Sequence, residues 1–153
     1  MKEKSPAAEL NGFLAKYSPE IASRAKSALV KMRQLLPGAI ELVYDNYNAL
    51  AIGFASTERV SDVVFSIALY PRWISLFFLQ TGAQLNDPKR LLKGSGTRIR
   101  HIVLESADDL DKQDIRVLMA EALELAYVPF DAAQKNRIVI KSISAKQRPR
   151  RPA

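Results

Sequence analysis

Two long segments of the chain place apolar residues three and four positions apart, which is the spacing of an amphipathic helix. The first segment begins at Ser18, a residue suited to capping a helix, and ends at Pro37-Gly38. Its apolar stripe consists of Ile21, Ala25, Ala28, Leu29, Met32, Leu35 and Leu36. The second segment starts in the acidic stretch after Ser106 and ends at Pro129. Its apolar stripe consists of Ile115, Leu118, Met119, Ala122, Leu123 and Ala126.

The period of the apolar residues changes to two between these helices, which predicts β-strands. The expected strands cover residues 39–44, 50–54, 62–70, 73–79 and 98–104. Two shorter helices are expected over residues 6–16 and 89–93. The third and fourth strands are apolar on both faces, so they should be central or covered by a helix. The order of elements predicts an α+β fold: an antiparallel sheet of about five strands with two long helices on one face.

A chain of 153 residues is long enough for one domain of ordinary size. We expect an N-terminal helix or arm in residues 1–17, an α+β domain in residues 18–131 and a basic tail in residues 132–153. Residues 137–143 have strand character and suit an edge of the sheet. Residues 146–153 hold two prolines and four basic side chains, so we expect them to be disordered.

The formal net charge of +7 arises entirely in this tail. The first 131 residues contain 16 basic and 16 acidic side chains, whereas the last 22 contain seven basic and no acidic ones. Such a tail can bind nucleic acid nonspecifically by releasing counterions from the phosphates. The residues expected to do so are Lys146, Arg148, Arg150 and Arg151. A purely solubilising tail is the alternative.

The composition excludes several classes of chemistry. The absence of cysteine excludes disulfides, thiolate nucleophiles and cysteine-ligated metal sites. His101 is the only histidine, so no site can use two imidazoles of one chain, and its basic neighbours favour a structural or surface role. No apolar run approaches the ~20 residues of a membrane span, and the N-terminus lacks the apolar core of a secretory signal. We expect a cytoplasmic protein without membrane contact. An enzyme is the least favoured class, because no visible motif supplies a nucleophile, a base and an orienting group.

The loop around Gly94-Ser95-Gly96 is the best candidate for an anion site. Basic side chains surround the glycines, and no acidic residue occurs between Pro88 and Leu104. Flexible backbone N–H groups beside cations can hold a phosphate or a carboxylate. Aromatic residues near the ends of the strands can line a pocket where helices leave the sheet uncovered. The candidate ligand residues are Tyr44, Tyr70, Trp73, Lys93, Ser95, Arg98 and Arg100. A glycine turn beside ordinary sheet packing explains the same residues without a ligand.

Acidic residues cluster after Ser106 and give a candidate metal site. Oxygen ligands at this density can hold a hard cation. The candidate ligands are Asp108, Asp109 and Asp111. The alternative is capping, because acidic side chains are favoured at a helix N-terminus and Lys112 and Arg116 lie within reach.

The strand segments and the glycine loop, together with the tail, resemble a known family. The matching segments are Ile40–Asp45, Trp73–Phe78, Leu91–Thr97, Arg98–Ile102 and the ending Ile138–Pro152. Residues 20–126 and the tail resemble the YdhG-like family of unknown function. The resemblance implies a compact, frataxin-like α+β domain from the bacterial cytoplasm. Some relatives are described as iron chaperones, so the resemblance alone suggests iron as a cofactor.

Three functions therefore remain as hypotheses. The first is a non-enzymatic module that binds a small anionic ligand or a protein partner. The second is frataxin-like iron binding through the carboxylates at 108–111. The third is nonspecific contact of the basic tail with nucleic acid.

Overall fold

The computed structural model describes residues 4–153, which form a mixed six-stranded sheet and three α-helices. The helices are α1 (Pro6–Leu14), α2 (Pro19–Leu35) and α3 (Gln113–Glu124). The strands are β1 (Ile40–Asp45), β2 (Leu50–Ala55), β3 (Val63–Leu69), β4 (Ile74–Phe78), β5 (Arg100–Leu104) and β6 (Arg137–Ile143). Three short 3₁₀ turns join them: η1 (Val60–Asp62), η2 (Gly82–Gln84) and η3 (Ala107–Asp111). None of the helices described in residues 4–153 is long and apolar enough to cross a membrane.

The strands lie in the order β5-β4-β3-β2-β1-β6. Strands β1 to β5 form the expected antiparallel meander, but β6 pairs in parallel with β1. The predicted α+β class is confirmed, whereas the prediction of an antiparallel sheet of about five strands is wrong at this edge. Strand β6 covers residues 137–143, the segment expected to suit a sheet edge. Its parallel pairing with β1 joins segments nearly 100 residues apart, and no local pattern encodes that choice of edge and direction.

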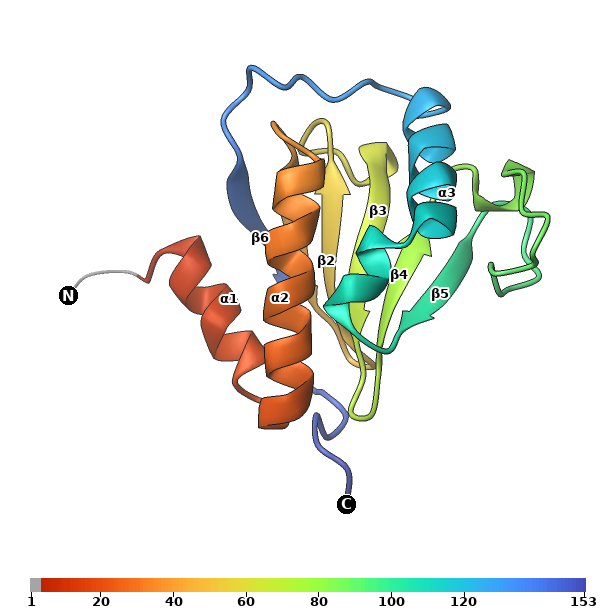
Figure 1. Cartoon of the computed structure of the whole chain (residues 1–153). Coiled ribbons are helices and arrows are strands. Elements are labelled where there is room, and N and C mark those ends of the chain that lie inside the picture. The colour runs from red at the N-terminus through yellow and green to blue at the C-terminus, as the bar shows by residue number, and fades with distance from the viewer. Residues whose placement is uncertain (1–3) are drawn as a thin grey trace.

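All three helices pack on one face of the sheet (Figure 1). The apolar stripe of α2 lies against the inward side chains of the strands, and Ala25, Ala28 and Met32 are fully buried. The helix begins as the sequence predicts, because the Ser18 hydroxyl accepts a hydrogen bond from the Ile21 backbone N–H and Pro19 takes the first position. In the described part of the chain, residues 4–153, no helix covers the opposite face of the sheet (Figure 1).

Gly38 is required where α2 turns into β1. Its φ of +85° lies in the left-handed region, and a Cβ there would lie 1.9 Å from the Asp131 carbonyl oxygen. The Asn136 side chain also accepts a hydrogen bond from the Gly38 N–H. This close contact holds the start of the sheet against the chain that leads into β6.

Two helix predictions are wrong in detail. Residues 89–93 form no helix, because the Asp87 carboxylate accepts hydrogen bonds from the backbone N–H groups of Leu91 and Leu92 and fixes a loop. The acidic start of the last long helix is the separate turn η3, and extended backbone at Lys112 divides it from α3.

The tail is ordered, which corrects the expectation of disorder for residues 146–153. Arg150 is 6% exposed, and its guanidinium donates to the Asp45 carboxylate over 2.9 Å. The Gln147 side chain donates to the Asp45 carbonyl oxygen, and the Arg148 N–H donates to the Tyr47 carbonyl oxygen. The composition of the tail favoured disorder, but a buried carboxylate at the end of β1 provides a partner that composition does not show.

Candidate functional site

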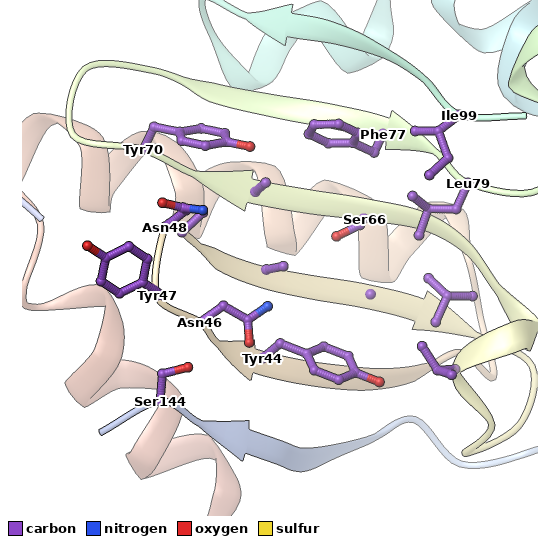
Figure 2. Close-up of a pocket in the computed structure, with 16 residues that line it drawn as sticks. Tyr44, Asn46, Tyr47, Asn48, Ser66, Tyr70, Phe77, Leu79, Ile99 and Ser144 are labelled. Atoms are coloured by element: carbon purple, nitrogen blue, oxygen red, sulfur yellow. The ribbon is translucent and has the colours of Figure 1, made fainter. Parts of the chain in front are cut away.

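The face of the sheet without helices is hollowed along its centre (Figure 2). Small side chains on β2 and β3 form the floor of the hollow: Ala51, Gly53, Ser66 and Ala68. Tyr44 stands on one side, and Tyr70 and Phe77 stand on the other (Figure 2). We call this hollow the trough.

The strand register brings the floor and one wall together. Tyr44 pairs with Ala51, which pairs with Ala68, and Gly53 pairs with Ser66. Each of these positions alternates along its strand with a large residue that faces the helices, such as Ile52 on β2. The trough therefore lies on the side of the sheet that faces away from the helices, where every second residue of β2 and β3 is small.

Gly53 leaves room for the side chain of Val63, which packs over β2 at one end of the trough. A Cβ at this position would lie 2.9 Å from Cγ1 of Val63, whose side chain is 3% exposed. Val63 and Val60 close one end of the trough together with Leu79 and Ile99. The β1–β2 turn and Ser144 close the other end (Figure 2). The volume of the trough is about 590 Å³.

The trough is largely apolar, with a few polar groups in its lining. No charged side chain lines it among residues 4–153. Burial raises the pKa of both the Tyr44 and the Tyr70 hydroxyl, so both stay protonated and able to donate at neutral pH. None of the hydrogen bonds described for residues 4–153 involves the side-chain hydroxyl of Tyr44, Ser66 or Tyr70, and these groups are available to a ligand.

The structure divides the predicted ligand residues into three groups. Tyr44 and Tyr70 line the trough. Trp73 lies outside it and stacks on Tyr70, with ring centroids 4.9 Å apart. The remaining four belong to the glycine loop and the start of β5, and they do not line the trough: Lys93, Ser95, Arg98 and Arg100.

The glycine loop is held by its own residues. Arg100 donates hydrogen bonds to the carbonyl oxygens of Gly96 and Ile99 over 2.6 and 2.8 Å. Lys93 forms a backbone bridge with His101, whose ring stacks on Phe77. The loop thus contributes to the trough only through Ile99, an apolar residue.

The small residues on the trough floor are not among the site residues predicted from the sequence. In residues 50–55 and 63–69, large apolar residues alternate with Ala, Gly and Ser. That alternation was enough to predict strands, and its small members also indicate a hollow on one face of the sheet.

The predicted metal ligands have other partners. Asp109 completes a capping box with Ser106, and its carboxylate also contacts Lys112 at 3.0 Å. Asp111 pairs with Lys31 and Arg116, whose hydrogen bonds lower the pKa of its carboxyl group. Asp108 lies 3.6 Å from Lys31. Within residues 4–153, no three acidic or histidine side chains are placed to hold a metal ion. The carboxylates cap η3 and bind it to α2.

The four basic tail residues predicted to contact nucleic acid fall into two groups, one buried and three exposed. Arg150 is buried against Asp45, so it is not free to contact a phosphate. Lys146, Arg148 and Arg151 remain exposed. Arg151 donates from Nε to the Lys16 carbonyl oxygen over 3.2 Å.

Comparison of the chain with family models, curated proteins and solved structures finds no match. The resemblance to the YdhG-like family therefore stays a prediction.

Proposed function

We propose that the protein is a non-enzymatic binding module and that the trough binds a small, neutral molecule with an apolar or aromatic body. The supporting observation is a hollow of about 590 Å³ that, within residues 4–153, is lined by available hydroxyls and no charged side chain. Sites of ~300–1,000 Å³ suit drug-sized molecules. A filled, flat sheet face would instead suit a protein partner.

The lining residues indicate how such a molecule would lie. A planar body fits against the small floor residues, between Tyr44 and the Phe77 ring. Offset or edge-to-face contacts with these rings contribute ~0.5–1.5 kcal/mol each beyond the area they bury. The hydroxyls of Tyr44, Ser66 and Tyr70 then select for a ligand with a matching acceptor or donor.

A neutral ligand takes the place of the anionic ligand expected from the sequence. The basic residues behind that expectation, including Lys93 and Arg98, lie outside the trough. An anion placed in the trough would lose water without gaining a cation as partner, which is unfavourable.

The test fills the floor of the trough without changing the core. Neutral aromatic compounds are screened by protein-observed NMR, and their affinities are compared with those for Ala51→Leu. We expect bound compounds to shift the resonances of trough residues and Ala51→Leu to weaken binding at least about tenfold, since a larger side chain occupies the site.

Ala133→Leu is the matched control, because Ala133 is exposed in the loop before β6 and does not line the trough. It should bind as the wild type does. Equal binding to Ala51→Leu and wild type, or resonance shifts confined to other surfaces, would reject the trough as the site.

A further inference from the structure

A second hollow adjoins the trough at the β3–β4 turn. The turn residues Tyr70 to Trp73 form one wall, and residues 148–153 form the other. The volume is about 890 Å³, and the hollow shares Tyr70 and Asn48 with the trough. We call it the arginine groove.

The wall formed by the tail is fixed in place by Arg150. This buried guanidinium donates to the carboxylate of Asp45 and the carbonyl of Asn46, and it lies 5.7 Å from the centre of the Tyr17 ring. The backbone near Arg150 is therefore fixed, and the nearby side chains of Arg148 and Arg151 line the groove. A disordered tail would present the same charges without a defined position.

Among the residues that the structure describes, 4–153, three basic side chains line the arginine groove and no acidic side chain does. They are Arg72 from the turn and Arg148 and Arg151 from the tail. Within residues 4–153, neither Arg72 nor Arg148 forms an ion pair. Arginine presents a planar set of donors that matches a phosphate, so this cluster suits a phosphate-bearing ligand.

An aromatic surface lies beside these cations. Trp73 is 41% exposed, and it stacks on Tyr70 with an angle of 22° between the rings. The stacked partner supports the indole, so an exposed ring is available for a planar ligand without rearrangement. Arginines beside an exposed aromatic ring are the usual means by which proteins bind single nucleotides within a strand.

We propose that the arginine groove binds the nucleotide unit, a planar base joined to phosphate, with the base against Trp73 and the phosphate at Arg72 and Arg148. The unit is either a free nucleotide or one residue of a single-stranded nucleic acid. This site differs from the trough in charge and in most of its lining, and its test does not depend on the function proposed for the trough.

The experiment uses the full chain and two probes, adenosine monophosphate and a single-stranded oligothymidine of about eight nucleotides. Trp73 is the only tryptophan, so its fluorescence reports directly on the groove. Affinity is measured by calorimetry, which serves all variants. We expect saturable quenching of Trp73, and a loss of about 5- to 150-fold in affinity for Trp73→Leu, the range for removing one stacked base.

The two sources are separated by comparing the probes. Tighter binding of the oligothymidine identifies a single strand, and its affinity should then fall with salt at a log–log slope near −2 for three phosphate contacts, at about −0.7 each. Equal or tighter binding of adenosine monophosphate identifies a free nucleotide.

Arg72→Gln/Arg148→Gln is the second variant and should lose at least about tenfold in affinity. Its matched control is Lys93→Gln/Arg98→Gln, which removes the same charge from the glycine loop. A loss only in this control would move the anion site to that loop and overturn the proposal. So would pyrophosphate binding as tightly as the nucleotide, equal binding of double-stranded DNA, or no binding of either probe. Ala51→Leu should leave nucleotide binding unchanged, which separates this result from that of the trough.

Discussion

At the scale of single residues, Asp45 has the most unusual surroundings. Its side chain is 1% exposed, and it contacts the side chains of Lys16 and Arg150 at 2.6 and 2.9 Å. Burial by itself raises the pKa of this carboxyl group, but hydrogen bonds from Lys16, Gln147 and Arg150 outweigh burial and lower it. Asp45 is therefore ionised in the folded protein and stabilises the fold only while its partners remain in place.

Asp45→Asn should lower the free energy of unfolding by about 3–5 kcal/mol at pH 7, because Arg150 would stay buried without a counter-charge. The folded pKa lies below the unfolded value of about 3.9, so the contribution is present above that pH and is lost as the pH falls through the folded pKa. Urea denaturation at several pH values should show the two proteins differing at pH 7 and converging below about pH 4. A constant difference down to low pH would contradict this account.

At the scale of elements, the packing between β2 and β3 shapes the trough. Their register shifts between Phe54 and Ala55, and this irregularity places Val63 over Gly53. A side chain on Gly53 would therefore compete with Val63 for the same space. The glycine is needed here for lack of volume, whereas Gly38 is needed for its backbone conformation.

Gly53→Ala should lower the free energy of unfolding by about 1–3 kcal/mol through overpacking against Val63. Adding Val63→Ala should recover part of the loss, so the double variant costs less than the sum of its parts. Gly12→Ala is the control: within residues 4–153, no atom beyond its own stretch of α1 lies within 4 Å of the added Cβ, and alanine favours a helix. Additive losses in the double variant, measured by urea denaturation, would rule out the proposed contact.

Local patterns predicted the elements well and their partners poorly. Alternation in residues 50–54 predicted β2, and the stripe from Ile21 to Leu36 predicted α2, because each pattern reflects the element's own buried face. The pairing of β6, the loop at residues 89–93 and the ordered tail all depend on contacts made elsewhere in the chain. For the site, Tyr44 and Tyr70 were predicted from their places at strand ends. The small floor residues are visible in the sequence of each strand, whereas their alignment across β1, β2 and β3 depends on the register.

At the scale of the whole molecule, the basic tail acts as part of the fold. Arg150 pairs with Asp45, Arg137 pairs with Glu58, and Lys141 donates to the Glu58 carbonyl oxygen. The net charge of +7 is thus concentrated in a segment that holds both β6 and the wall of the arginine groove. The basic side chains of this segment therefore stabilise the fold as well as charging its surface.

Deleting residues 144–153 should lower the free energy of unfolding by about 2–4 kcal/mol, because Asp45 then keeps only Lys16 as a charged partner. Deleting only residues 151–153 keeps Arg150 and should cost less than about 1 kcal/mol. Urea denaturation of both truncations gives the comparison. Equal stability of the longer truncation and the wild type would show that the tail does not stabilise the fold.

The pairing of Asp45 with Arg150 also has a consequence during synthesis. A ribosome adds ~5–20 residues per second, so the 105 residues between these partners take roughly 5 to 20 s to appear. For that time the outer edge of β1 lacks β6, and the Asp45 carboxylate at the end of β1 lacks the Arg150 guanidinium. The growing chain thus carries an open strand edge, the feature that invites aggregation or a chaperone, until β6 and Arg150 emerge.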